Sequence, residues 1–280
     1  MQTTDLGGHS GCHVLLCERD VDCVFVRKIA SNIDYNNRLK IQAEKQKKYS
    51  NEVIKTPAVL GTGYTDEGLF YFDMEYIQGI TLAEYMNTIE IGRIKGLLDT
   101  IVKNIVPADY VKIEVNEEIF VTKIRALEEN LQGHNNPTIN SAIKLLKHHS
   151  WMKFIETPCH GDLTLENIIV KDNQLYLIDF LDSFYDCWIL DVSTLMQDVQ
   201  TMWSYRFQEE VNINTLLRLI VFRDILMDMV RSRVGDDAVE VYYALLLKLI
   251  RIYPYTKDPK TYEFLNEKTE SIINIIKGVS

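Results

Sequence analysis

Residues 159–180 read CHGDLTLENIIVKDNQLYLIDF, and this segment contains the polar side chains that point most clearly to a function. Two short apolar runs, Ile168 to Val170 and Leu175 to Ile178, flank a polar turn, which predicts a small β-hairpin. Acidic residues stand at both ends of it, Asp162 before the hairpin and Asp179 after it. The segment therefore predicts a tight hairpin that carries carboxylates.

The polar residues of this segment follow the pattern HxDxxxxN, formed by His160, Asp162 and Asn167, with Asp179 following in LIDF. Phosphoryl transfer needs a carboxylate close to the acceptor hydroxyl and oxygen ligands that hold Mg²⁺ against the nucleotide phosphates. An irregular loop followed by a tight hairpin can bring such groups together at one edge. A fixed four-residue pattern should arise by chance in only about two chains per thousand of this composition. The alternative is a set of turns and caps, where Asp and Asn are favoured anyway.

The periodicity changes along the chain. The first 78 residues predict mostly sheet with one helix, because β-branched runs flank turns near residues 19–22 and 66–68, and a Lys-rich stretch over 34–50 lacks Gly and Pro. From Thr81 onward, apolar residues recur with helical spacing. The predicted fold class is α+β, with a sheet-rich first part and a largely helical second part.

The composition excludes several classes of protein. The 280 residues include 30 basic and 40 acidic ones, a net charge of −10, which disfavours a nucleic-acid groove because phosphate binding needs a basic stripe. Apolar runs are interrupted by charges well before the roughly 20 residues that a bilayer span requires, so no membrane insertion is expected. The first residues, MQTTDLGGHS, have neither a basic start nor an apolar core, so no secretion is expected, and five cysteines without a CxxC pair predict reduced thiols and a cytoplasmic location.

The acidity is uneven. Residues 1–80 carry nine basic and eleven acidic side chains, whereas the remainder carries 21 and 29. The second part therefore has a net charge of −8, which weakly suggests a neutral or cationic partner there, although a solvated acidic surface is the commoner explanation.

The segments HGDLTLENIIV, YLIDFLDS and WILDVS resemble the aminoglycoside phosphotransferase and choline kinase family, the small-molecule kinases of the protein-kinase-like fold. The resemblance covers roughly residues 5 to 195. It implies a bilobal protein, with a nucleotide-binding lobe over 1–78 and a catalytic and acceptor-binding lobe over 79–280.

The resemblance also implies roles for the polar residues. Asp162 would be the catalytic residue that orients, and deprotonates, the acceptor hydroxyl. Asn167 and Asp179 would bind Mg²⁺. His160 would brace the loop, and Asp191 would support the loop from a following helix.

The N-terminal part resembles the same family. LGGHSGCHVLL is similar to its glycine-rich turn, in which Gly8, Ser10 and Gly11 let backbone N–H groups approach the phosphates. VFVRKIA resembles the strand whose basic residue pairs with the nucleotide phosphates. Arg27 and Lys28 point to opposite faces of a strand, so only one can do this, and the resemblance slightly favours Arg27.

Two further features complete the implied nucleotide site. Glu44 is the expected ion-pair partner of that basic residue, though Gln42 fits the spacing nearly as well. FDMEYIQG resembles the hinge of the family, where the backbone of Glu75 and Ile77 would hold the adenine.

The implied function is an ATP- and Mg²⁺-dependent transfer of the γ-phosphoryl group to a hydroxyl of a small molecule. An amino alcohol such as choline, a sugar and an aminoglycoside all stay open as acceptors, as do oligomeric state and the choice of ATP or GTP. Trp188, Trp203 and Tyr205 could form an aromatic cage for a quaternary ammonium, but packing is their expected role.

Two alternatives remain. One is a nucleotide-binding pseudokinase that acts as an interaction module. The other is a protein kinase, which is disfavoured because only 11 residues separate Asp179 from Asp191, too few for a peptide-presenting activation segment. The loop also reads HGD where protein kinases usually read HRD.

Overall fold

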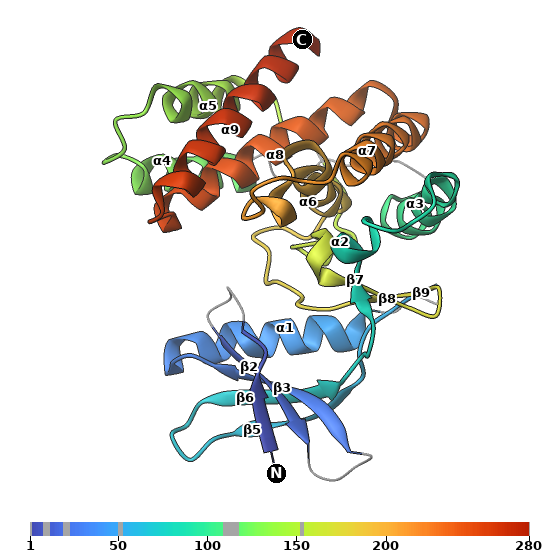
Figure 1. The fold of residues 1–280 in the computed structure, drawn as a ribbon. Helices are drawn as coiled ribbons and strands as arrows, with labels where there is room; N and C mark the ends of the chain where they lie inside the picture. Colours follow the sequence, from blue (N-terminus) through green and yellow to red (C-terminus); the bar gives the residue numbers. More distant parts are fainter. Residues whose placement is uncertain are drawn as a thin grey trace. The chain divides into compact units, whose positions relative to one another are not determined.

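The computed structural model describes residues 2–7, 12–18, 23–49, 53–108, 118–151 and 154–279. The chain forms two compact units (Figure 1): residues 1–82 with 166–182, and residues 83–165 with 183–280. Among the described residues, no helix is long and apolar enough to cross a membrane.

The first unit is built on a five-stranded antiparallel sheet with strand order β1-β2-β3-β6-β5. Helix α1 packs on it through Leu39 and Ala43, which join Val26, Phe72 and Met74 in one core. The strands and helices are β1 Gln2–Asp5, β2 Cys12–Glu18, β3 Val24–Ala30, β5 Val59–Tyr64, β6 Phe70–Glu75, α1 Asn36–Lys48 and a 3₁₀ turn over Ile33–Tyr35.

A second, four-stranded sheet contains the predicted hairpin. β8 (Ile168–Lys171) and β9 (Gln174–Leu177) pair antiparallel, and positive φ angles at Asp172 and Asn173 give the turn that matches the strand twist. Two-residue strands from the N-terminal part, β4 (Ile54–Lys55) and β7 (Ile80–Thr81), flank the hairpin in the order β4-β9-β8-β7.

This pairing groups the hairpin with the first unit. The predicted lobes, divided between residues 78 and 79, assigned the hairpin to the helical part, whereas the contacts assign residues 166–182 to the sheet-rich unit. The strands β4 and β7, which pair with the hairpin, have only two residues each. They are too short to show an alternating pattern in the sequence, so this pairing could not be predicted.

The second unit is helical. Its central helices α6 and α8 pack against each other (Figure 1) and are buried over most of their length, so they form the core of this unit. The helices are α2 Leu82–Tyr85, α3 Ile91–Ile105, α4 Glu118–Asn130, α5 Pro137–His148, α6 Trp188–Thr201, α7 Ile213–Val234, α8 Glu240–Ile252 and α9 Pro259–Val279, with 3₁₀ turns over Trp203–Tyr205, Gly235–Val239 and Tyr253–Tyr255. A further 3₁₀ turn, Leu165–Asn167, lies where the chain passes from this unit to the first.

Candidate functional site

The predicted site residues are divided between the two units. The chain passes from one unit to the other between Leu165 and Glu166, so Asp162 belongs to the helical unit, whereas Asn167 and Asp179 belong to the sheet-rich unit.

An ion pair in the sheet-rich unit joins β3 to the segment after β9. Lys28 is 3% exposed, and its Nζ lies 2.5 Å from Oδ1 of Asp179. Burial, the largest influence, lowers the pKa of Lys28, but the charge of Asp179, with smaller contributions from Cys12 and Tyr35, outweighs it and raises the pKa. The lysine is therefore held as a cation beside a candidate metal ligand.

Arg27 points to the other face of β3. Its guanidinium binds both oxygens of Asp73 on the neighbouring strand, at 2.6 and 2.8 Å, and lies 4.0 Å from the ring centroid of Tyr71. The pKa of Arg27 is raised, chiefly by its hydrogen bond to Asp73. Arg27 is thus engaged within the sheet, so these contacts do not support the slight preference for Arg27 as the phosphate-binding base.

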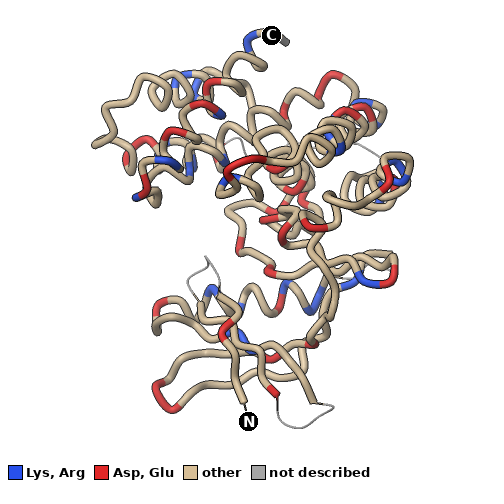
Figure 2. The backbone as a smooth tube through the Cα atoms, viewed as in Figure 1, with Lys and Arg blue, Asp and Glu red and all other residues tan. Residues whose placement is uncertain are grey.

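Helix α1 does not present Glu44 to Lys28. Lys and Arg recur along this helix (Figure 2), and Glu44 lies on its exposed side. Gln42 is 2% exposed instead, and its Nε2 donates to the Tyr35 hydroxyl at 3.2 Å. Glu44 is therefore not the partner of Lys28 in this structure, and the alternative position, Gln42, is the one that faces inward.

The same helix fixes the segment that follows Asp179. Lys45 Nζ donates to the carbonyl of Leu181 at 2.9 Å, and the rings of Tyr49 and Phe180 lie 5.2 Å apart. On the outer side, the guanidinium of Arg38 binds both carboxylate oxygens of Asp182 at 3.0 Å. The backbone on the C-terminal side of Asp179 is thereby held against α1.

Asn167 and Asp179 both lie at the open end of the hairpin. The carbonyl of Asn167 accepts a hydrogen bond from the N–H of Ile178 at 3.0 Å, which sets Asn167 beside the residue preceding Asp179. Asp179 has a φ of +62°, a conformation that costs a non-glycine residue energy and is often found at functional sites.

These two residues fit Mg²⁺, which binds one or two protein oxygens and completes its shell with phosphates and water. Among the described residues, no group of three or more His, Cys, Asp or Glu could hold a metal ion.

The remaining nucleotide-site predictions have different outcomes. Gly8, Ser10 and Gly11 lie outside the described residues. The N–H of Glu75 donates to the carbonyl of Ala58 at 2.9 Å, so this group already has a partner within the sheet. Ile77 is buried, and no described residue hydrogen-bonds its backbone, so its amide and carbonyl could still bind a base.

In the helical unit, Asp191 organises the loop that contains Asp162. This carboxylate on α6 is 1% exposed and accepts hydrogen bonds from the backbone N–H groups of His160 and Gly161, both at 2.8 Å, and from the thiol of Cys159 at 3.3 Å. Several N–H donors converging on one buried carboxylate make strong, charge-assisted bonds. Asp191 therefore fixes the loop immediately before Asp162.

The loop itself is tightly turned. His160 is fully buried, and its Nδ1 accepts from the N–H of Asp162 at 3.3 Å, while the carbonyl of Asp162 accepts from Thr164 at 2.8 Å. Gly161 has a φ of +90°, which L side chains rarely adopt, so glycine is required at this point. The side chain of Asp162 is only partly buried and extends from a backbone that its neighbours fix.

A second buried aspartate on α6 supports the other end of the loop, and the sequence analysis missed it. Asp198 is fully buried, accepts from the N–H of Leu165 at 2.5 Å, and binds the N–H and hydroxyl of Ser204 at 2.8 and 2.7 Å. It lies seven residues after Asp191, hence two turns along the same helix face. The available signal was a second acid in the apolar run WILDVSTLMQDV.

Lys248, also missed, reaches the loop from α8. It is 6% exposed, and its Nζ donates to the carbonyl of Gly161 at 3.2 Å. Burial and the nearby charge of Arg251 lower the pKa of Lys248 to about 8, against opposing effects of Asp162, Asp191 and Cys159.

The lowered pKa of Lys248 predicts a pH dependence of stability. Between about pH 8 and its ordinary value of 10.5, the unfolded chain binds more protons at this residue, so its contribution to the free energy of unfolding becomes more favourable as pH rises. The free energy of unfolding of wild type minus that of Lys248→Met should increase over this range, by about 3 kcal/mol at most, and stay constant below it. Urea titrations at pH 7, 8, 9 and 10 measure the difference, and a flat difference would contradict the prediction.

The aromatic residues after the hairpin are used in packing. Trp188 is 1% exposed, and the hydroxyl of the buried Tyr205 donates to the carbonyl of Ala83 at 2.7 Å. The guanidinium of Arg206 already lies 4.2 Å from the ring centroid of Trp203. These three rings do not form a cage for a quaternary ammonium.

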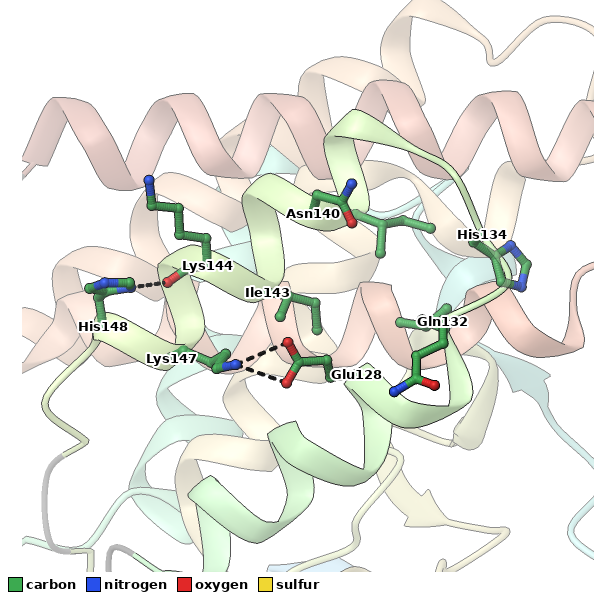
Figure 3. A pocket seen from close by; sticks show the side chains of 10 residues that line it. Glu128, Gln132, His134, Asn140, Ile143, Lys144, Lys147 and His148 are labelled. Carbon is green, nitrogen blue, oxygen red and sulfur yellow. Dashed lines mark hydrogen bonds and ion pairs between the residues drawn. The ribbon is translucent and has the colours of Figure 1, made fainter.

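A hollow of about 470 Å³ lies between α4 and α5 (Figure 3). Two of its charged groups are paired with each other, because Lys147 Nζ lies 2.9 Å from both oxygens of Glu128, and the His148 ring hydrogen-bonds the backbone carbonyl of Lys144. None of the predicted site residues lines it.

Comparisons with known proteins agree with these features. The model of the phosphotransferase enzyme family matches residues 28–219, about two thirds of the chain. No curated protein sequence matches.

Several solved structures are similar. A thermostable mutant of the aminoglycoside phosphotransferase APH(4)-Ia, in a ternary complex with AMP-PNP and hygromycin B, matches 98% of this chain and 93% of its own, with a TM-score of 0.66 and 11% identity. The aminoglycoside phosphotransferase APH(2")-IIa with streptomycin and ATP matches 98% and 91%, with a TM-score of 0.56 and 16% identity. The amicoumacin kinase hAmiN, in complex with AMP-PNP, Ca²⁺ and Ami, matches 98% and 88%, with a TM-score of 0.56 and 14% identity.

At these identities the structural matches show the fold, and they confirm the predicted α+β, kinase-like architecture. The family match confirms the predicted family and the prediction of a phosphotransferase enzyme. The chain belongs to the phosphotransferase enzyme family.

Proposed function

We propose that this protein transfers the γ-phosphoryl group of ATP to a hydroxyl group of a small molecule. The observation that carries the proposal is the pair of Lys28 and Asp179, 2.5 Å apart, because a buried lysine beside a carboxylate unites the two charges needed to hold nucleotide phosphates and their metal. The buried side chain of Gln42 on α1 is neutral, so it does not balance the charge of Lys28. The carboxylate that does so is that of Asp179.

Each residue has one task in this proposal. Lys28 binds the phosphates of ATP, and Asn167 and Asp179 hold Mg²⁺, which when bound neutralises charge on the β and γ phosphates. Asp162 orients the acceptor hydroxyl and accepts its proton. The acceptor oxygen forms a bond to the γ-phosphorus, the bond between that phosphorus and the β–γ bridging oxygen breaks, and ADP leaves with the bridging oxygen.

The acceptor is a small molecule in this proposal. The 11 residues between Asp179 and Asp191 are too few to present a peptide. Hygromycin B and streptomycin are bound in the similar structures, which supports small hydroxylated acceptors here. Choline is the least supported of the three predicted acceptors, because the rings of Trp188, Trp203 and Tyr205 are already packed. None of the five cysteines forms a disulfide, which supports the predicted cytoplasmic location.

An ADP-release assay over a panel of hydroxylated small molecules, with ATP and Mg²⁺, tests the function. Acceptor-dependent ADP release with a phosphorylated product is the expected result. Tight ATP binding without any turnover would instead favour the pseudokinase, and phosphorylation of peptides alone would favour the protein kinase.

Replacing Lys28 with methionine is expected to lower kcat/KM for ATP by about 10²-fold, because methionine keeps the length and apolar stem but removes a buried charge worth roughly 2–3 kcal/mol to bound phosphates. Arg27→Met is the matched control, since Arg27 binds Asp73 on the other face of β3. Initial rates against ATP concentration measure both variants. A larger loss in Arg27→Met than in Lys28→Met would restore Arg27 as the phosphate-binding base.

A further inference from the structure

A small cationic pocket lies beside the catalytic loop, entirely within the helical unit. It is lined by Gly161 of the loop, Lys123 of α4, Phe184, and Lys248 and Arg251 of α8. We call these five residues the cationic pocket. Its free volume of about 20 Å³ admits one water molecule or one oxygen of an anionic group.

The cationic pocket continues into a wider groove. Lys123 and Phe184 also line this groove of about 420 Å³, together with residues of α4 that include Ile119, Thr122 and Ala126. Glu118 is the acidic residue of this lining. The groove thus offers an apolar wall for the body of a small molecule, and the cationic pocket lies at the end shared by Lys123 and Phe184.

Lys248 and Arg251, two of the three basic residues of this pocket, form no ion pair with any described residue. Arg251 lies one helical turn beyond Lys248, and among the described residues it forms no hydrogen bond or ion pair, while Lys248 donates only to the carbonyl of Gly161. The carboxylates whose charges raise the pKa of Lys248 are those of Asp162 and Asp191. Asp191 already accepts three hydrogen bonds from the loop.

Two neighbouring cations, one of them buried, are costly unless something of opposite charge joins them. One oxygen of a carboxylate or a phosphate that enters the pocket can accept charge-assisted hydrogen bonds from the guanidinium of Arg251 and from the ammonium of Lys248. Such an arrangement is suited to an anion.

We propose that the cationic pocket binds an anionic group of the acceptor, so that the substrate class is a hydroxylated carboxylate or phosphate, such as a sugar acid or a sugar phosphate. The inference rests on the proposed phosphotransferase function. It places the anionic group at Arg251 and Lys248, and the reacting hydroxyl at Asp162, the residue that follows Gly161 in the loop.

This inference differs from the expectation drawn from net charge. The net charge of −8 in the second part suggested a neutral or cationic partner. Acidic and basic residues are both spread over the helices (Figure 2), so the net charge describes the whole surface. The lining of the cationic pocket itself contains three basic residues and no acidic one. A cationic acceptor such as an aminoglycoside would bring like charges together there.

Four compounds with one carbon skeleton test the substrate class: D-glucose, D-glucosamine, D-gluconate and D-glucose-6-phosphate. We expect ADP release with gluconate or the sugar phosphate to have a kcat/KM at least about tenfold above that with glucose, with glucosamine lowest, since a charge-assisted pair is worth roughly a tenfold to hundredfold gain. The two anions distinguish a carboxylate from a phosphate preference. Preference for glucosamine or glucose would overturn the proposal.

Arg251→Glu tests the residue. This change should abolish or reverse the preference for the anion through KM for the acceptor, while KM for ATP stays the same. Arg231→Glu, on the exposed surface of α7 with Asp228 3.5 Å away, is the matched charge reversal. If the ratio of kcat/KM for the anionic acceptor to that for the neutral acceptor is the same in Arg251→Glu as in wild type, the proposal is wrong.

Binding provides a readout that does not depend on turnover. Isothermal titration of gluconate and of inorganic phosphate into the full chain, with AMP-PNP and Mg²⁺ present to occupy the nucleotide site, should show binding in wild type and Arg231→Glu but at least about tenfold weaker binding in Arg251→Glu. Anion binding that depends on Arg251 without any ADP release would support the pocket and contradict the proposed function. ADP release without anion binding would support the proposed function and contradict the proposed anion site.

Discussion

Asp162→Ala is expected to lower kcat for phosphoryl transfer by at least about 10²-fold while KM for ATP stays within a few-fold of wild type, because the variant loses the carboxylate that orients and deprotonates the acceptor hydroxyl. The fold of the loop should persist, because the variant keeps the backbone hydrogen bonds of residue 162: its N–H donates to His160, and its carbonyl accepts from Thr164.

Initial rates of ADP release, with thermal unfolding of each variant as a check on the fold, measure this effect. Asp228→Ala, an exposed aspartate on α7, is the control for loss of a surface carboxylate. Asp162→Asn separates orientation from proton acceptance, because the amide can still position a hydroxyl but cannot take its proton. Equal turnover by Asp162→Ala and wild type would remove Asp162 from the catalytic role.

Asp191→Ala should have the largest effect on stability. It leaves the N–H groups of His160 and Gly161 buried without their acceptor and removes a negative charge close to the buried Lys248. Each unsatisfied buried donor costs about 1–3 kcal/mol, so we expect a loss of roughly 3–5 kcal/mol and a fall of about 10 °C in Tm.

Differential scanning calorimetry and hydrogen exchange at Gly161 test this expectation together. Faster exchange at Gly161 should accompany the lower Tm, because the same carboxylate holds that amide. Asp99→Ala on the surface of α3, whose carboxylate lies 3.9 Å from Lys103, should change Tm by less than about 2 °C. A Tm of Asp191→Ala within that margin would mean that another group supports the loop.

The sequence was sufficient for the elements that depend on local pattern. The hairpin of β8 and β9 follows from two apolar runs around a turn, and α1 follows from a stretch without Gly or Pro that buries Leu39 and Ala43. The resemblance of HGDLTLENIIV, YLIDFLDS and WILDVS to a known family indicated the family before any coordinates, and the family match confirms it. Local spacing determines secondary structure and motifs because their hydrogen bonds join near neighbours.

The tertiary structure alone decided which side chains meet. Strand alternation puts Arg27 and Lys28 on opposite faces but does not reveal which face lies against Asp179, some 150 residues away in the chain. The inward position of Gln42 rather than Glu44 likewise depends on how α1 packs against the sheet.

Asp198 and Lys248 were invisible for the same reason. Each is a charged residue in a helix that is otherwise largely buried. Its role depends on a hydrogen bond to the backbone of the loop, from Leu165 to Asp198 and from Lys248 to Gly161. The hairpin's membership of the sheet-rich unit came from β4 and β7, strands too short to have a period. Sequence pattern reports local backbone preference, whereas partners distant in the chain are chosen by packing and by the need to satisfy buried polar groups.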